Sequence, residues 1–310
     1  MKVLLPFTMC NNCDLKPVFK LKSGENLCKK CYLQYFEKKV RKTIRVHNLI
    51  DNNDKIGVAV SGGKDSLTVL DLLCSIYKEN PKIKIQAILI DEGIKDYRDK
   101  SIETAKAFCK EKNVPLKIIS YQEKFNFQLD DVVEGRNPCS VCGVLRRNLL
   151  NEAAIELGVT KLATGHNLDD EAQSILMNQF RKNVESSARM GPITGINDTE
   201  EFVRRIKPLY FMSEKEVMTY AFLKNIVDVF NECPYSNQSF RNSLRDLINK
   251  FEEQYPGSKN AVVHSFLEIL PLLKDKHKTS STLNKCKECG GPTSKDICQK
   301  CVVLGEIKPN

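Results

Sequence analysis

The 310-residue chain contains no run of about 18 consecutive apolar residues, the length that a transmembrane helix needs. Its first residues are apolar, but neither a long hydrophobic segment nor a small-residue cleavage pattern follows them. We therefore expect neither a membrane-spanning helix nor a secretory signal peptide. The expectation is a cytoplasmic protein without a membrane partner.

Two frequent nucleotide-binding sequences are missing as well. A Walker A loop has Ser or Thr directly after its Gly-Lys pair, whereas Asp65 follows Lys64 here. The dinucleotide fingerprint Gly-x-Gly-x-x-Gly does not occur. These absences exclude two common phosphate-binding loops, so a phosphate site in this chain must use a different one.

A different small-residue loop stands between a predicted strand and a predicted helix. Residues 55–60 are a short apolar run rich in Val and Ile, which is typical of a buried parallel strand. Apolar residues recur at helical spacing over 67–76, so a helix should begin near Asp65. Between them, the sequence Ser-Gly-Gly-Lys-Asp-Ser at 61–66 offers close backbone approach, hydroxyl groups and a positive charge. An ordinary strand-to-helix turn does not need this combination, so the stretch predicts a phosphate site.

Thirteen cysteines are the most unusual feature of the composition. In a cytoplasmic protein, so many cysteines indicate metal ligands or catalytic groups more than disulfides. Eleven of them fall into three groups, whereas Cys74 and Cys109 stand alone in apolar helical stretches. We expect these two to be small core residues.

Two of the three groups have the spacing of four-thiolate zinc sites. Each consists of two Cys-x2-Cys pairs, and each pair can hold one side of a tetrahedral ion from a tight turn. Soft thiolates favour zinc over magnesium or calcium. We therefore predict two zinc ions per chain, with the ligands Cys10, Cys13, Cys28, Cys31, Cys286, Cys289, Cys298 and Cys301.

The third group is Cys139, Cys142 and Cys233, and the residues alone leave three interpretations open. One is a structural Cys-x2-Cys with an accidental third cysteine, and another is a redox pair that carries a persulfide. The last is an iron–sulfur cluster held by three thiolates. Three protein ligands on a four-iron cluster leave one iron open, and an open position is what a metal needs to bind a substrate atom.

Residues 51–235 alternate between strand and helix patterns, which predicts an α/β fold with a parallel sheet and helices on both faces. Strands are expected at 56–60, 83–90, 116–120, 161–164 and, weakly, 226–229, and helices at 66–77, 98–112, 142–157 and 168–181. Residues 182–207 are poor in periodicity, and within them residues 189–195 predict a loop. Around this domain we expect an N-terminal zinc knuckle (1–33), a basic linker helix (34–50), a helical extension (236–273), a linker (274–284) and a C-terminal zinc knuckle (285–310).

Ligands of such folds bind beyond the carboxyl ends of the strands, and two acidic motifs lie there. Asp-Glu-Gly at 91–93 follows one predicted strand, and Gly-His-Asn-Leu-Asp-Asp at 165–170 follows another. Asp169 or Asp170 could cap the helix that begins there, but adjacent carboxylates beside a nucleotide also suit Mg²⁺. The pattern does not tell which of the two would bind the ion. We expect His166 to be a structural residue.

The formal net charge of +9 indicates an acidic partner such as RNA. Residues 32–50 predict a helix rich in Lys and Arg, which would be either a solvated linker or an RNA-facing surface. Arg146 and Arg147 follow Cys142 by one helical turn, and Arg204, Arg205 and Lys207 form a second basic stretch. Both are interpreted either as ordinary surface or as contacts to phosphate.

The loop at 61–66 resembles the PP-loop of the ATP pyrophosphatase superfamily, whose members adenylate a carbonyl oxygen and release pyrophosphate. The Gly-His-Asn-x-Asp-Asp motif, the two knuckles, Cys139-x2-Cys142 and the distant Cys233-Pro234 extend the resemblance. The chain as a whole looks like the TtuA-type tRNA 2-thiouridine synthetases. The resemblance covers nearly all residues, and five motifs agree in order.

This resemblance implies an ATP-dependent tRNA sulfurtransferase that adenylates the C2 oxygen of a uridine and replaces it with sulfur, at the wobble position rather than in the T-loop. It implies a 4Fe-4S cluster on Cys139, Cys142 and Cys233, and it makes Asp170 a catalytic or magnesium-binding residue. The residues expected to bind ATP are Ala59, Val60, Ser61, Gly62, Gly63, Lys64, Asp65, Ser66, Asp91, Gly93, Gly165 and Asp170.

The implied partners are tRNA, a second copy of the chain, and a sulfur donor. That donor would be a ubiquitin-like thiocarboxylate carrier, a persulfide or sulfide. Two rival functions remain at this stage. One is a cluster-free thiolase in which Cys139 or Cys142 carries a persulfide, and the other is a non-catalytic, zinc-dependent RNA-binding protein.

Overall fold

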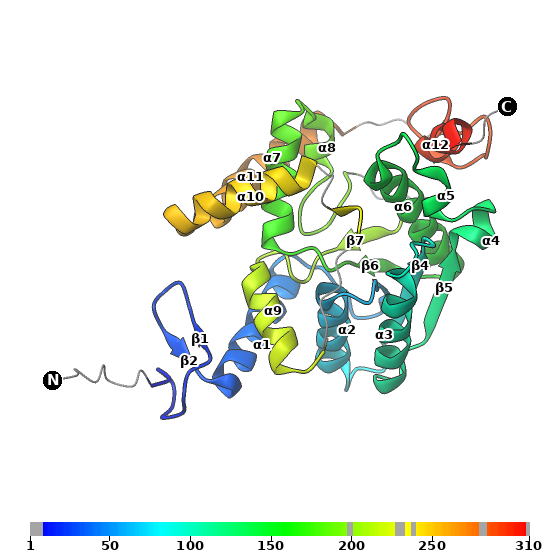
Figure 1. Ribbon diagram of the computed structural model, residues 1–310. Coiled ribbons are helices and arrows are strands. Elements are labelled where there is room, and N and C mark those ends of the chain that lie inside the picture. Colours follow the sequence, from blue (N-terminus) through cyan, green and yellow to red (C-terminus); the bar gives the residue numbers. More distant parts are fainter. Residues whose placement is uncertain (1–8, 197–200, 227–232, 237–239, 279–283, 308–310) are drawn as a thin grey trace.

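The computed structural model describes residues 9–196, 201–226, 233–236, 240–278 and 284–307. Its centre is a five-stranded sheet in the order β5-β4-β3-β6-β7, in which every neighbouring pair is parallel (Figure 1). The strands are β3 (Lys55–Ala59), β4 (Lys84–Asp91), β5 (Leu116–Ser120), β6 (Lys161–Ala163) and β7 (Arg204–Ile206).

The middle of this sheet is buried on both faces. In β4, Ala87 and Leu89 join one core with α2 and α3, whereas the alternate residues Ile88 and Ile90 join a second core with α6. Strands buried on both faces are typical of parallel sheets, and the predicted α/β fold is confirmed. The three covering helices are α2 (Lys64–Tyr77), α3 (Arg98–Glu111) and α6 (Pro138–Glu156).

The order of the strands places a switch point at β3. This strand has β4 on one side and β6 on the other, so the chain moves across the sheet first in one direction and then in the opposite direction. The loop after β3 and the loop after β6 therefore open beside each other at the carboxyl edge. Ligands of open α/β sheets bind at this kind of crevice.

The fifth strand of the described sheet is β7, whereas the weakly predicted strand at 226–229 is not tested because residues 227–229 lie outside the described residues. β7 lies within 182–207, a stretch poor in periodicity for which no strand was predicted, and the same stretch contains the short helix α8 (Val184–Ala188). The sequence did not indicate this strand because β7 is a three-residue edge strand that contains two arginines. Such a strand offers no apolar run for a sequence pattern to detect.

The basic helix of the prediction is α1 (Lys29–Val46), and it is part of the core. Tyr32, Phe36 and Val40 are fully buried against α9 (Glu214–Leu223), where Phe36 stacks on Tyr220 with ring centroids 4.3 Å apart. The N-terminal knuckle, with β1 (Phe19–Lys20) and β2 (Asn26–Leu27), leads directly into α1. The helix is therefore a structural element with one solvated basic face.

A third core joins α7 (Leu168–Phe180) to α10 (Phe240–Gln254) and α11 (Ser258–Lys276), through residues such as Ala172, Ile248 and Phe266. The C-terminal knuckle contacts α6 on the opposite side of the molecule from the N-terminal one (Figure 1). No helix that the structure describes is long and apolar enough to cross a membrane. The remaining elements are α4 (Tyr121–Phe125), α5 (Leu129–Val132), β8 (Asn284–Lys285), β9 (Pro292–Thr293) and α12 (Gln299–Ile307).

Candidate active site

The loop after β3 closes tightly around its own hydroxyl groups. Ser66 Oγ accepts a hydrogen bond from Ser61 N and donates one to Gly63 O, both at 3.0 Å. Gly62 has φ +80°, and a Cβ there would lie 2.2 Å from the carbonyl oxygen of Ser101. Glycine is therefore required at this position, and α2 begins at Lys64, directly after the loop. This arrangement directs the N-terminus of α2 into the crevice.

The loop after β6 packs against the same helix start. A Cβ on Gly165 would lie 2.8 Å from Ser66 N, so glycine allows the two backbones to meet. Asn167 Nδ2 donates to Asp65 Oδ1 at 3.2 Å across the switch point. The two predicted motifs thus form one continuous floor, although they lie about a hundred residues apart in sequence.

Asp169 and Asp170 have different environments. Asp169 is buried, forms an ion pair with Lys259 of α11, and accepts a hydrogen bond from Glu214 N at 2.8 Å. Asp170 completes a capping box with Asn167, and its Oδ1 faces Arg241 Nη1 at 3.4 Å. Burial raises the pKa of Asp170 to about 6, although Arg241 opposes that shift. Of the two acids, Asp170 alone lines the cavity described next.

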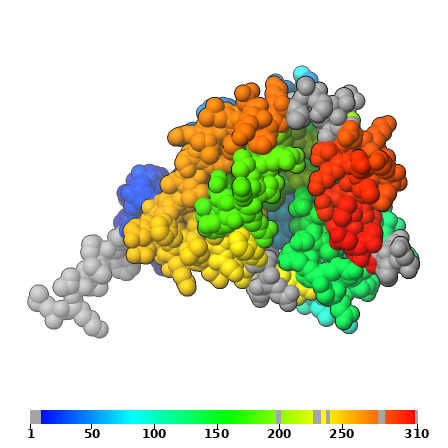
Figure 2. Space-filling model, turned by 90° about the horizontal axis from the view of Figure 1, so that it is seen from above, coloured from blue at the N-terminus to red at the C-terminus, as the bar shows by residue number. Residues whose placement is uncertain are grey.

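A cavity of about 310 Å³ lies above this floor, and residues from both halves of the domain line it. Asp65 and Asp170 belong to one wall, whereas Cys139, Cys142 and Cys233 belong to the other. Viewed from above, the molecule shows a hollow between the part formed by α7 and α8 and the part formed by α6 with the C-terminal knuckle (Figure 2). The structure therefore brings together two of the predicted ATP-binding residues and all three cysteines of the third group.

The cysteine wall is built by the first turn of α6 and by the Cys233-Pro234 segment. Asn137 caps α6 by accepting from Ser140 N at 3.1 Å, so Cys139 and Cys142 lie on the first turn. Cys139 Sγ is 3.6 Å from the carbonyl oxygen of Tyr235, which places the distant segment beside the helix. Burial raises the pKa of Cys142 to about 11, so this thiol needs a cation to become a thiolate.

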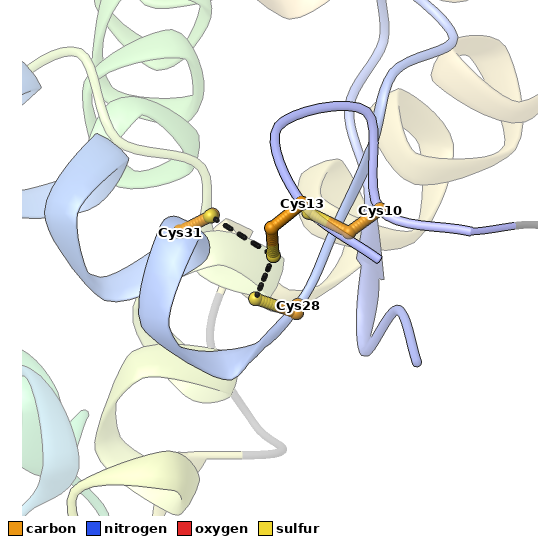
Figure 3. A group of neighbouring side chains, drawn as sticks. All are labelled: Cys10, Cys13, Cys28 and Cys31. Atoms are coloured by element: carbon orange, nitrogen blue, oxygen red, sulfur yellow. Dashed lines mark hydrogen bonds between the residues drawn. The ribbon is translucent and has the colours of Figure 1, made fainter. Parts of the chain in front are cut away.

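Both four-cysteine groups are already gathered to the size of a zinc site. Within each group, all four sulfur atoms lie within 4.8 Å of one another. In the N-terminal group, Cys13 Sγ lies 3.5 Å from Cys28 Sγ and 3.8 Å from Cys31 Sγ (Figure 3). Sulfur atoms around tetrahedral zinc are separated by about 3.8 Å. Among the described residues, the three cavity cysteines do not form such a group.

A buried acid connects the loop after β3 with the cysteine helix. Glu92 is almost fully buried, and its carboxylate lies 2.8 Å from Arg98 Nε and 3.6 Å from Arg146 Nη1. Arg98 also donates to the carbonyl oxygen of Ser61 at 3.2 Å. The sequence singled out the motif around Glu92 but gave this residue no role, because its function depends on two arginines distant in sequence.

Of the twelve predicted ATP-binding residues, Asp65 and Asp170 line the cavity and the other ten do not. Two of those ten, Asp91 and Gly93, stabilise a turn. Asp91 Oδ1 accepts from Gly93 N at 2.9 Å, and Gly93 has φ +71° with Gln128 beside it. Conversely, Arg241 and Arg245 of α10 line the cavity, and Lys64 Nζ lies 3.2 Å from Glu214 Oε1. The sequence predicted α10 only as part of a helical extension. A helical pattern carries no signal for which face meets a distant cavity.

His166 is exposed, and its Nδ1 lies 2.9 Å from Thr164 Oγ1. Desolvation together with nearby cations lowers its pKa well below the usual value, and its structural role stays a prediction. Cys109 is buried and Cys74 is half-buried, in α3 and α2 respectively. Burial raises the pKa of both thiols to about 11, which fits the predicted role of inert core residues.

Comparisons with known proteins place these features in a wider context. A family model described as a PP-loop domain matches residues 33–252. The chain is 35% identical to the tRNA 2-thiolation protein NcsA of Haloferax volcanii, over 96% of this chain and 99% of that one. It is also 35% identical to the tRNA-5-methyluridine(54) 2-sulfurtransferase of Pyrococcus horikoshii, over 96% and 93%. A solved structure, the U34-tRNA thiolase NcsA from Methanococcus maripaludis with its 4Fe-4S cluster, is similar with a TM-score of 0.83 and 36% identity, over 97% of both chains.

Proposed function

The chain belongs to the PP-loop domain family, and from that membership we propose that it is an ATP-dependent tRNA sulfurtransferase. The reaction replaces the C2 oxygen of a uridine by sulfur. The observation that carries this proposal is the shared cavity, in which the acids of a nucleotide site face three cysteines. A protein that only bound RNA would not need both walls.

The first half of the proposed reaction uses the floor of the cavity. ATP would bind with its phosphates at the loop 61–66, where backbone amides, Lys64 and the N-terminus of α2 stabilise negative charge. Mg²⁺ would bind Asp170, because Asp170 lines the cavity whereas Asp169 is buried against Lys259. The uridine C2 oxygen attacks the α-phosphate, and pyrophosphate leaves. The base must be displaced from its stack to reach this position.

The second half uses the cysteine wall. A sulfur nucleophile adds to C2, and the oxygen leaves as part of AMP. Cys139, Cys142 and Cys233 would hold a 4Fe-4S cluster, which, when bound, supplies an iron without a protein ligand for a sulfur atom. Glu92 fixes Arg146 between the two walls, and Arg146 can stabilise the negative charge of the leaving group.

The remaining features complete the proposal. Each four-cysteine group would hold one structural zinc ion, and sets of free thiols at this density suit a reducing, cytoplasmic compartment. The modified uridine is proposed to be the wobble uridine, because the similar solved structure from Methanococcus maripaludis is named as a U34-tRNA thiolase. The sulfur donor is one of the three named above, and the protein is proposed to act as a homodimer.

The decisive experiment is a thiolation assay with anaerobically reconstituted protein, ATP, sulfide and unmodified tRNA, followed by mass spectrometry of the nucleosides. We expect 2-thiouridine at the wobble position, and pyrophosphate release that depends on tRNA. Thiolation in the T-loop would overturn the assigned position but leave the reaction intact. Full activity of iron-free protein would favour the persulfide rival, and binding without pyrophosphate release would favour the non-catalytic one.

A further inference from the structure

Two arginines that are distant in sequence, Arg147 of α6 and Arg205 of β7, are brought to the same level of two elements that pack together. Asn151 of α6 donates to Glu201 O at 2.8 Å and accepts from Val203 N at 2.9 Å, which fixes α6 against the entrance to β7. Arg147 lies one helical turn before Asn151, and Arg205 lies two residues after Val203. Because α6 connects two parallel strands, it runs antiparallel to them. One helical turn and two strand residues both advance about 6 Å, so these two side chains start from the same level.

The two guanidinium groups have no acidic partner. Neither Arg147 nor Arg205 forms an ion pair with any acid that the structure describes, whereas the neighbouring Arg146 faces Glu92. Arg147 is exposed, and Arg205 is partly exposed. Burial, together with the charges of Arg147 and Arg146, lowers the pKa of Arg205 to about 10. Like charges held together without a counterion favour the binding of an anion.

This pair extends the positive side of the cavity outward. Arg146 lines the cavity, and Arg147 is the next residue along α6. Arg205 and Arg146 both contribute to the positive field at His166, beside the floor. A nucleotide that enters the cavity carries a phosphate on each side of its sugar, and these phosphates remain near the rim. Guanidinium groups match the geometry of phosphate oxygens by paired hydrogen bonds.

We infer that Arg147 and Arg205 bind the phosphodiester backbone of the RNA strand beside the target nucleotide. This inference rests on the proposed function, because it takes tRNA as the substrate. The phosphates of ATP are the other source of the same chemistry. They have their own site at the loop 61–66, and neither Arg147 nor Arg205 lines the cavity that contains Asp65.

The test uses the cluster-loaded full chain and an unmodified tRNA transcript. The variants are Arg147→Gln, Arg205→Gln and both together, and tRNA affinity is measured over a range of salt concentrations by fluorescence anisotropy. The slope of log affinity against log salt should decrease by about 1 for each guanidinium removed, because fewer counterions are released on binding. The KM for tRNA should rise, while ATP affinity and iron content stay at the wild-type level.

Arg204→Gln is the matched control. It removes the same charge from the same strand, but alternate residues of a strand point to opposite faces. In agreement, the charge of Arg204 helps to lower the pKa of Lys274 in α11, whereas the charge of Arg147 in α6 helps to lower the pKa of Arg205. The control should keep the wild-type slope, and Arg205→Lys should keep most of it because the charge remains.

An unchanged salt slope in the double variant would overturn the inference. So would an equal loss in Arg204→Gln, or a loss of ATP affinity with tRNA binding intact. The binding measurement is independent of catalysis. If the wild-type protein thiolates no base but the slope still falls, the proposed function fails and the RNA site stands. If thiolation occurs and the double variant has the wild-type KM and slope, the RNA site fails and the function stands.

Discussion

Cysteines at the two termini and cysteines in the central cavity differ in how they are gathered. Each terminal group has four sulfur atoms within 4.8 Å of one another, which would complete the coordination shell of a tetrahedral ion. The cavity has three cysteines that are more widely spaced, on two segments, and acidic residues line the same cavity. A metal held by the first arrangement would have no position for a substrate, whereas a four-iron cluster held by the second would have one.

The same contrast between closed and open groups recurs elsewhere in the molecule. Asp169 is buried and paired with Lys259 and Glu214 N, whereas Asp170 lines the cavity and pairs there with Arg241 at 3.4 Å. On α1, Lys39 Nζ forms an ion pair with Glu216 Oε1 at 2.8 Å, whereas Lys38 and Arg41 are exposed. Adjacent residues of one chemical type can therefore have different functions, and the structure distinguishes them by their partners.

The largest expected effect comes from removing one of the three cysteines that line the cavity. Cys142→Ala should abolish thiolation and iron binding, because two thiolates do not hold a four-iron cluster. ATP binding and both zinc ions should remain, since the floor of the cavity and the knuckles do not contact this residue. Iron, zinc and thiolation are measured on the reconstituted variant, with Cys109→Ala as the control for a buried cysteine outside the site. Full thiolation by the Cys142 variant would refute the cluster.

Removing one cysteine of a four-cysteine terminal group should lower the stability of the protein and leave the cavity and its chemistry in place. Cys298→Ser should lose one zinc ion and make residues 284–307 sensitive to protease, because a segment this short cannot bury a core without its metal. Iron content and ATP affinity should stay, and tRNA affinity should fall. Cys28→Ser should lower the melting temperature of the whole protein, because Cys28 belongs to the first core together with α1. Intact protein without any zinc would contradict this prediction.

The sequence predicted most of the sheet and of the metal ligands because their signals are local. The loop at 61–66, the Cys-x2-Cys pairs and the strands other than β7 are visible as short patterns, and the resemblance to the PP-loop superfamily is confirmed by the family match. The relation between the cavity cysteines was open until Cys233 was placed beside α6, about ninety residues away in sequence.

The parts that were missed depend on tertiary contacts. Arg241 is one of two arginines on an amphipathic helix, and only the packing of α10 against α7 directs it to Asp170. Lys259 appears as an ordinary surface lysine in the sequence, yet it is buried against Asp169. Neither residue type nor spacing carries this information, because both contacts join segments whose separation in space is set by the whole fold.

The difference between Asp169 and Asp170 gives a test on stability. Lys259→Met keeps the length of the side chain but leaves the Asp169 carboxylate buried without its cation, which should cost about 3–5 kcal/mol. Lys22→Met removes the exposed Lys22–Glu252 pair near the same helices and should cost about 1 kcal/mol at most. Unfolding by urea measures both. Equal losses of unfolding free energy in the two variants would mean that the Asp169–Lys259 ion pair is not buried.

Asp170 should be recognised by the pH dependence of metal binding. Its pKa is raised to about 6 in the folded protein and is near 3.8 when unfolded, so the folded state keeps a proton that the unfolded state has lost. Metal-free stability should therefore fall as pH rises from about 4 to 6 and then level off. Mg²⁺-dependent ATP affinity should rise over about pH 5.5–7, because the ion needs the carboxylate. Asp170→Asn should remove both dependences, and a flat profile in the wild-type protein would contradict the assignment.

The smallest expected effect concerns the open face of α1. Lys38, Arg41 and Lys42 are exposed, and replacing them with Gln should reduce the salt slope of tRNA binding by about 1 for each phosphate that they neutralise. Lys39→Gln is the control, because its ammonium is paired with Glu216 and its removal should lower stability rather than the slope. Anisotropy at several salt concentrations and thermal melts separate the two effects. If the triple variant keeps the wild-type slope, this face of α1 is a solvated surface, and the RNA contacts lie at the cavity rim and the knuckles instead.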